Sequence, residues 1–223
     1  MTPEKVKSVI EKYFGSWKAS GPKPETLLPS VPSNKPSVAG IPNSSRIQDE
    51  VILAQTLDLT RSNPDYYALE LGNHVLGGGF YATRLYQDLR ERSGLVYYVA
   101  SSFDVGKTRS LYLVRYGCDP PNVSKARDIV ERNLKEMQMT LVSSEKLQLA
   151  KALLLREIPL EESSVEAIAQ GFLHRATHDL PLDEPMLAAR RYVKLTAEEV
   201  KAAFAKWLRP KDLVEITEGP GPK

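Results

Sequence analysis

Two polar side chains seven positions apart, Arg90 and Tyr97, have the types and spacing best suited to chemistry in this 223-residue sequence. Arg90 is expected near the end of a helix, Gly94 lets the chain reverse, and Tyr97 begins the next strand. That order can bring a guanidinium group and a phenol to one edge of a sheet. There both could donate hydrogen bonds to a peptide carbonyl, or to the oxyanion formed when water attacks it. The structural alternative is that Arg90 complements the helix dipole and that Tyr97 only packs.

Two histidines, His174 and His178, lie four residues apart in an expected helix, which is the spacing of a possible metal pair. A thermolysin-type site requires glutamate directly after the first histidine, whereas this sequence has Arg175, which would repel a cation. No third ligand is evident, although Glu157 and Asp179 are available. The pattern favours two partly exposed histidines over a metal site, and we assign no metal ligand to this chain.

A run of three glycines, Gly77, Gly78 and Gly79, could cradle a phosphate if it preceded a helix. Here the run follows an expected helix, and neither the P-loop pattern nor the dinucleotide-binding pattern is present. The glycines are therefore expected to end that helix in a tight turn.

The composition excludes several classes of function. The net charge is +2, from 30 basic and 28 acidic residues, and no basic patch indicates nucleic-acid binding. The single cysteine, Cys118, excludes an intrachain disulfide and a cysteine zinc cluster. No stretch approaches the ~20 apolar residues of a membrane span. A hydrophobic content of 42% is typical of globular proteins rather than of disordered chains.

The N-terminal region is expected to be an amphipathic helix on a long connector. Thr2 can cap the helix, Pro3 suits its first position, and Gly15 ends it. Its apolar face comprises Val6, Val9, Ile10, Tyr13 and Phe14. Six prolines between residues 22 and 42 exclude a helix or a central strand and indicate an extended linker. A tethered helix of this kind indicates the end of a preceding domain, so the chain is interpreted as a fragment or a short partner subunit.

The remaining sequence predicts one compact α+β unit. In chain order we expect a strand at 51–59, helices at 63–76 and 82–92, a hairpin of strands 96–103 and 110–117, helices at 122–139 and 143–157, further helices, and a strand at 213–217. Capping boxes are expected at Ser163 with Glu166 and at Thr196 with Glu199. This order predicts a two-layer sandwich, a mainly antiparallel sheet with helices on one face.

Several segments resemble a known family. They are residues 63–67 (NPDYY), 73–80 (NHVLGGGF), 83–85 (TRL), 89–97 (LRERSGLVY), 179–182 (DLPL) and 195–200 (LTAEEV). Together they are similar to the C-terminal domain of the insulinase/pitrilysin family, which includes the mitochondrial processing peptidases. The opening helix, ending in YFGSW, resembles the end of the preceding domain. The resemblance covers nearly the whole chain and implies three parts: a terminal helix of a preceding domain at 1–19, a Pro-rich linker at 20–46, and the peptidase-type domain at 47–223.

The resemblance implies a zinc endopeptidase in which two similar α+β domains enclose a chamber for peptides. The N-terminal-type domain holds zinc through a His-x-x-Glu-His motif. The C-terminal-type domain supplies an arginine and a tyrosine, placed as Arg90 and Tyr97 are here, which grip the substrate backbone and stabilise the tetrahedral intermediate. Gly77, Gly78 and Gly79, with Arg84, match a segment that handles the substrate in some relatives.

This chain departs from the family pattern because it has no His-x-x-Glu-His motif. The resemblance therefore implies that zinc comes from a complementary domain or subunit and that this chain carries no cofactor. We expect a C-terminal domain or partner subunit of a zinc metalloendopeptidase, inactive alone, whose partners are a peptide substrate and the zinc-bearing part. The alternative is a non-catalytic scaffold or peptide-binding subunit of the same fold.

Overall fold

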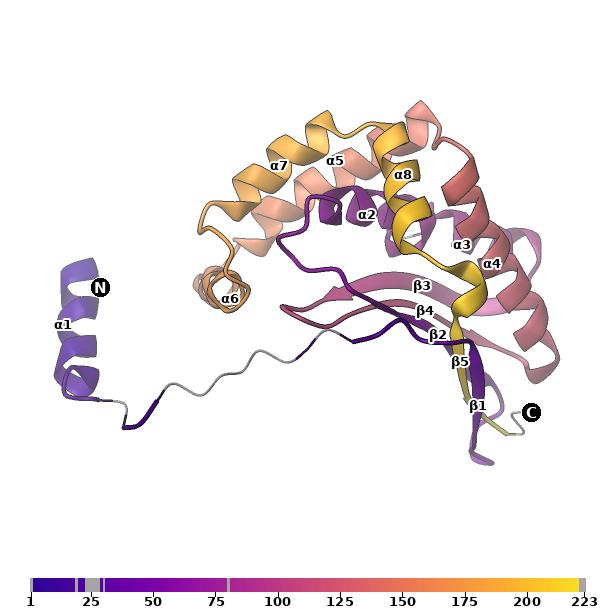
Figure 1. Cartoon of the computed structure of the whole chain (residues 1–223), viewed down its shortest axis with the longest axis horizontal. Helices are drawn as coiled ribbons and strands as arrows, with labels where there is room; N and C mark the ends of the chain where they lie inside the picture. The colour runs from indigo at the N-terminus through magenta and orange to yellow at the C-terminus, as the bar shows by residue number, and fades with distance from the viewer. Residues whose placement is uncertain (1, 19, 23–28, 30, 80, 221–223) are drawn as a thin grey trace.

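The structure is a computed structural model that describes residues 2–18, 20–22, 29, 31–79 and 81–220. Residues 23–28 of the predicted linker and Phe80 of the predicted family motif lie outside the described residues. The described chain forms two layers, a five-stranded sheet and a set of helices that covers one of its faces (Figure 1). The predicted α+β sandwich is confirmed.

The strands of the described sheet lie in the order β1-β5-β2-β4-β3. Their bounds are β1 Ser37–Pro42, β2 Asp49–Leu57, β3 Val96–Val105, β4 Ser110–Cys118 and β5 Val214–Gly219. β1 is parallel to β5, and the other neighbouring strands are antiparallel. The predicted hairpin is β3 with β4, and the chain reverses where the Gly106 amide donates to the Arg109 carbonyl at 3.0 Å.

The edge strand β1 lies inside residues 20–46, which the sequence predicts to be a linker. That linker prediction extends too far toward the C-terminus, because residues 37–42 pair with β5. Proline is tolerated at a sheet edge, where one side of the backbone needs no ladder partner. Pro36 directly precedes β1 and Pro42 ends it, so the proline density that excludes a central strand is compatible with this one.

One face of the sheet is covered and the other is open. Alternate residues of β2 point into the helix layer and are buried, whereas those between them are only half-buried. Such alternation is typical of an antiparallel sheet with a single packed face. The buried residues of β2 are Asp49, Val51, Leu53, Gln55 and Leu57.

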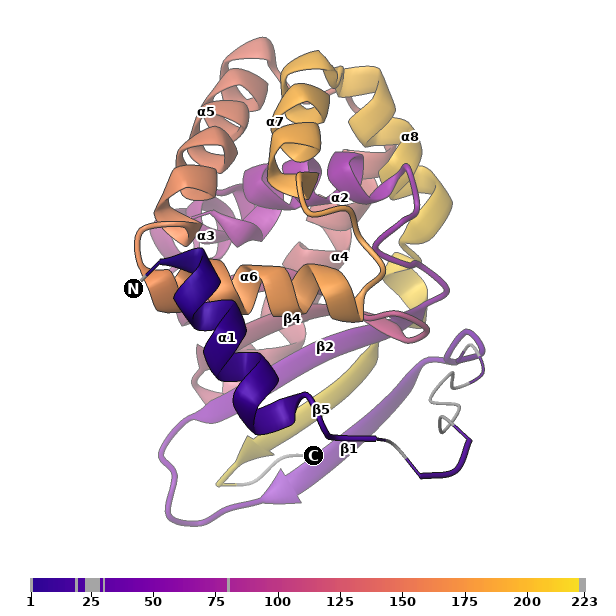
Figure 2. The ribbon, with the colours of Figure 1, turned by 90° about the vertical axis from the view of Figure 1, so that its left-hand side faces the viewer.

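All but the first of the described helices form the second layer (Figure 1). The bounds of the helices are α1 Pro3–Phe14, α2 Tyr66–Asn73, α3 Arg84–Tyr86, α4 Val123–Met139, α5 Ser144–Glu161, α6 Val165–Thr177, α7 Glu184–Lys194 and α8 Ala197–Trp207. Figures 1 and 2 show α5, α7 and α8 side by side above α2. Among the described residues, no helix combines the length and the apolar character that crossing a membrane requires.

Two predicted capping boxes have different outcomes. The box at Thr196 and Glu199 is confirmed: Thr196 Oγ1 accepts from the Glu199 amide at 3.2 Å, and Glu199 Oε2 accepts from the Thr196 amide at 2.9 Å. The box at Ser163 is wrong, because Ser164 caps α6 and its Oγ accepts from the Ala167 amide at 3.1 Å. Adjacent serines offer the same hydroxyl, and α6 begins one residue later than the pattern predicts.

The glycine run does not end its helix where the sequence predicts. After α2 the chain continues as a π-helical segment, His74–Gly78 (η1), so Gly77 and Gly78 lie inside the helix and Gly79 ends it. A Cβ at Gly77 would come within 2.5 Å of Ser101 Oγ and 2.8 Å of Leu85 Cδ1. The absence of a side chain at Gly77 therefore lets η1 approach β3 closely. The helix predicted at 82–92 is likewise α3 followed by a π-helical segment, Gln87–Arg92 (η2).

α1 has the predicted bounds but no buried residue. Thr2 caps it by accepting a hydrogen bond from the Lys5 amide. Its apolar stripe is exposed, with Tyr13 at 68% and the nearby Trp17 at 77% of full exposure. Figure 1 shows α1 apart from the two layers.

The contact between α2 and α8 gives a stability test. A Cβ at Gly72 would lie 2.3 Å from Phe204 Cε2 and 2.8 Å from Val200 Cγ1, and both side chains are fully buried. We expect Gly72→Ala to lower the free energy of unfolding by about 1–3 kcal/mol through overpacking, measured by urea denaturation.

The matched control is Gly171→Ala on α6, where the nearest atom to a new Cβ is Arg175 Nη1 at 3.2 Å, farther away than the 2.3 Å contact at Gly72. There the better helix propensity of alanine dominates, so stability is expected to be unchanged or to rise by up to about 1 kcal/mol. Equal stabilities of Gly72→Ala and the natural protein would contradict the tight α2–α8 contact.

Candidate functional site

The structure brings Arg90 and Tyr97 together at the start of β3. Arg90 lies in η2, and Gly94 takes a φ of +60°, which lets the chain turn back into the strand. Arg90 Nη1 donates to the Val96 carbonyl at 3.0 Å, and its Cζ lies 5.8 Å from the centroid of the Tyr97 ring. Both side chains are exposed, Tyr97 at 47%. The guanidinium and the phenol are therefore neighbours that an outside molecule can reach.

A β-bulge directs Tyr97 outward. In the register of β3 with β4, Val96 is opposite Cys118 and Tyr98 is opposite Gly117, so Tyr97 is the extra residue. Val96 is buried, whereas Tyr97 and Tyr98 are both exposed. A bulge changes the direction of a side chain in this way. β3 is also one of the two outer strands of the described sheet, which leaves Tyr97 at an edge.

The Tyr97 hydroxyl donates its proton to the Asp119 carboxylate, with distances of 3.1 Å to Oδ1 and 3.2 Å to Oδ2. That hydrogen bond is the main reason that the pKa of Tyr97 is raised, and the negative charge of Asp119 adds to it. Gln48 and Arg90 oppose the shift. The phenol is thus held in its protonated form, which is the form that can donate a hydrogen bond.

Asp119 is a residue that the sequence analysis misses, although a signal for it exists. The hairpin pairing places Cys118 opposite Val96. In an antiparallel pair the residue after Cys118 lies opposite the residue before Val96, so the register places Asp119 beside Leu95, and the Tyr97 hydroxyl reaches Asp119 diagonally, next to the bulge. An explicit register for the predicted hairpin would have placed Asp119 near the start of β3, but it would not have given the hydrogen bond to Tyr97.

The predicted substrate-binding residues lie in η1, at its end and in α3, away from the start of β3. Gly77 is buried, Gly78 is exposed, and Gly79 is half-buried. Gly77 faces Ser101, which is four residues beyond Tyr97 and hence about 13 Å further along the strand. The Arg84 side chain is largely buried, with Nη1 3.8 Å from Glu136 Oε2. The contact of these four residues with a substrate stays a prediction, as does the catalytic role of Arg90 and Tyr97.

The histidine pair does not fit the zinc that the resemblance implies. The rings of His174 and His178 lie close together, tilted by 31° with centroids 4.1 Å apart, and His178 Nδ1 lies 2.8 Å from the His174 carbonyl oxygen. Burial lowers the pKa of His174, and the neighbouring His178 adds to that effect. In the part of the chain that the structure describes, no group of three or more His, Cys, Asp or Glu side chains is arranged to hold a metal ion.

Known proteins resemble the chain in sequence and fold. The Bacillus subtilis protein named "Probable inactive metalloprotease YmfF" is 24% identical over 187 residues, which cover 80% of this chain and 41% of that protein. The structure of a peptidase M16 inactive domain from Pseudomonas fluorescens has a TM-score of 0.83 at 27% identity, covering 100% of this chain and 53% of the other. A Helicobacter pylori protease shares the fold, with a TM-score of 0.85 at 16% identity, covering 99% and 53%. The chain spans about half of the length of these proteins or less.

The family assignment rests on a direct sequence match as well. The model of the family described as "Peptidase M16 inactive domain" matches residues 1–154, which is more than half of the chain and includes both Arg90 and Tyr97. The resemblance predicted from the sequence is thereby confirmed, and the chain belongs to the family of peptidase M16 inactive domains.

Proposed function

We propose that this chain is the substrate-contacting part of a zinc metalloendopeptidase whose metal site lies in a complementary domain or subunit. The observation that carries the proposal is the exposed Arg90–Tyr97 pair at the outer strand of the sheet. A guanidinium group and a protonated phenol side by side suit a peptide carbonyl and the oxyanion that replaces it on attack.

The two side chains have different roles in this proposal. Arg90 uses Nη1 to hold the Val96 carbonyl, and a guanidinium group has five N–H donors, so it can bind a substrate carbonyl while it stays anchored. The Tyr97 hydroxyl has one hydrogen, and it donates its hydrogen bond to Asp119. As negative charge develops on the carbonyl oxygen, the phenol transfers that hydrogen bond from Asp119 to the oxyanion.

The exposed stripe of α1 supports a complementary domain as the partner. A helix whose apolar side chains are all exposed is stabilised by packing against another surface. The chain also spans about half of the P. fluorescens and H. pylori proteins. We therefore propose that the zinc-bearing part covers α1 and faces Arg90 and Tyr97.

A non-catalytic scaffold is the second candidate, and two observations favour it. The B. subtilis relative is named as a probable inactive metalloprotease, and the Tyr97 hydroxyl already has a strong acceptor in Asp119. Kinetics of variants distinguish the two candidates, because a scaffold has no use for the phenol proton.

The catalytic role predicts a loss of turnover in Tyr97→Phe. In the peptidase reconstituted with its zinc-bearing part, kcat should fall about ten- to a thousand-fold, the range for removal of one oxyanion donor. The ring and its contact with Arg90 remain, so KM should change little.

The matched control is Tyr98→Phe, which removes the adjacent exposed phenol, whose hydroxyl donates to Glu50. Its kcat should stay close to that of the natural protein. If Tyr97→Phe turns over at the same rate as Tyr98→Phe, the oxyanion role is rejected and the scaffold candidate is favoured.

The hydrogen bond between Tyr97 and Asp119 predicts a shift in titration. In Asp119→Asn the acceptor has no charge, so the phenolate is no longer disfavoured and the pKa of Tyr97 should fall toward its ordinary value of about 10. Titration of tyrosine Cζ by carbon NMR measures this, with the resonance assigned from Tyr97→Phe. An unchanged pKa would show that Asp119 does not hold the phenol proton.

Because no third ligand accompanies the two histidines among the described residues, the chain alone is expected to hold no stoichiometric zinc. Metal analysis of the purified chain after dialysis against zinc should give far less than one zinc per chain, and His178→Ala should not change the amount. One tightly held zinc per chain, lost in His178→Ala, would place a metal site in this domain instead of in its partner.

A further inference from the structure

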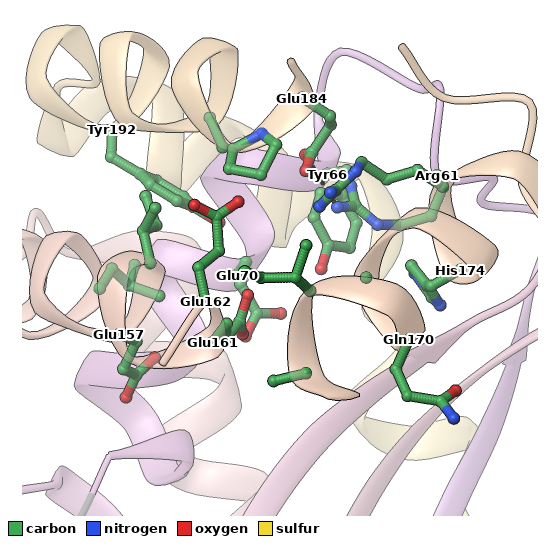
Figure 3. Close-up of a pocket in the computed structure, with 18 residues that line it drawn as sticks. Arg61, Tyr66, Glu70, Glu157, Glu161, Glu162, Gln170, His174, Glu184 and Tyr192 are labelled. Atoms are coloured by element: carbon green, nitrogen blue, oxygen red, sulfur yellow. Dashed lines mark hydrogen bonds and ion pairs between the residues drawn. The ribbon is translucent and has the colours of Figure 1, made fainter. Parts of the chain in front are cut away.

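A cavity of about 580 Å³ lies among α2, α5, α6 and α7 (Figure 3). This volume is within the range of small-molecule sites. Neither β3 nor η2 contributes a lining residue, so the cavity is separate from the Arg90–Tyr97 pair. Leu154, Ile158 and Ile168 give part of its wall an apolar character.

The cavity contains buried cationic donors that lack acceptors. Arg175 is only 7% exposed, and its Nε has no hydrogen-bond partner among the described residues. Arg61 Nη1 also lacks a hydrogen-bond partner among the described residues, although Arg61 Nη2 donates to Glu184 Oε1 at 2.9 Å. Arginine is rarely buried without a paired anion, because an unpaired donor costs free energy. Arg61 has Glu184 as its counterion, so Arg175 is the cation in this cavity for which the structure gives no ion pair.

Carboxylates gather on the other side of the cavity. Figure 3 shows Glu70, Glu157, Glu161 and Glu162 opposite Arg61. Glu157, Glu161 and Glu162 are exposed and stand at the mouth, whereas Glu70 is deeper. Burial is the largest cause that raises the pKa of Glu70 and of Glu161, and the charge of Glu157 adds to both. Arg61 opposes both shifts, His74 opposes the shift at Glu70, and Arg175 opposes the shift at Glu161. His74 Nδ1 lies 3.6 Å from Glu70 Oε1 and His74 Nε2 lies 3.3 Å from Glu157 Oε2, so Glu161 is the one of these three carboxylates that His74 does not contact. A cation among these groups would relieve their repulsion.

The two halves together define the ligand. A simple anion would meet the glutamates, and a simple cation would leave the donors of Arg175 and Arg61 without an acceptor. A zwitterion with an apolar body satisfies both halves and the apolar wall.

We propose that this cavity binds a short apolar peptide by its two free ends, the carboxylate at Arg175 and Arg61 and the ammonium group among Glu70, Glu157 and Glu161. A carboxylate and a guanidinium group form a charge-assisted, often bidentate hydrogen bond. The proposal does not depend on Arg90 or Tyr97, so its test and the test of the catalytic role are independent.

The test is calorimetric titration of the full chain with trialanine, N-acetyl-trialanine and trialanine amide. Trialanine should bind with a Kd below about 1 mM. Each capped peptide should bind at least about tenfold more weakly, because each loses one charge-assisted interaction. Absence of trialanine binding overturns the proposal, and so does equal binding of either capped peptide.

A variant pair locates the binding in the cavity. Arg175→Gln should lower the affinity for trialanine to that for trialanine amide, and it should leave the affinity for trialanine amide unchanged. The control is Arg190→Gln, which removes the same charge from an exposed position on α7 outside the cavity lining and should not change either affinity. An equal loss of affinity for trialanine in Arg175→Gln and Arg190→Gln would mean that net charge, not the cavity, governs binding, and it would overturn the proposal. If Arg175→Gln fails to fold, the affinities of the natural protein for the three peptides still test the proposal.

Discussion

The reversal of the chain at Gly94 is the constraint on which the Arg90–Tyr97 pair depends. The backbone there takes a positive φ, while space for a side chain is open. Conformation, rather than crowding, therefore makes glycine suitable. The turn returns the chain so that the Arg90 guanidinium reaches the Val96 carbonyl, and this hydrogen bond fixes the arginine beside the tyrosine. The bulge at Tyr97 then points the phenol outward instead of into the helix layer. The two features act on the same short segment, so the geometry of the pair follows from local structure.

The sheet separates the molecule into regions with different uses. Its covered face carries the helix layer, and the cavity with Arg175 lies among those helices. Its outer strand β3 carries Tyr97, and Arg90 lies beside it in η2. Helix packing can keep the buried arginine in place without affecting the edge, because no lining residue of the cavity belongs to β3 or η2. The proposed peptide contact at the edge and the proposed ligand cavity in the helix layer therefore use separate parts of the chain.

The sequence predicts best what short-range patterns determine. The strands other than β1, the hairpin, the α+β class and the cap at Thr196 depend on periodicity, turns and side chains within a few residues. Short-range patterns give wrong or missing predictions where contacts between distant segments determine the structure. Glycines often end helices, yet Gly77 lies inside the π-helical segment η1, where it packs closely against Ser101 of β3. Asp119 is missed because both the strand register and the bulge are needed to place it beside Tyr97. The cavity around Arg175 combines the distant helix α2 with the three consecutive helices α5, α6 and α7, so no local pattern indicates it.

The central claim is that Arg90 and Tyr97 act as a pair on one substrate carbonyl. A double-mutant cycle of kcat/KM with Arg90→Gln and Tyr97→Phe, in the peptidase reconstituted with its zinc-bearing part, tests this most directly. The account predicts that each single variant is impaired and that the double variant is little worse than the weaker of the two, because either change disrupts the same interaction. Losses that add fully, or single variants as active as the natural protein, would contradict it.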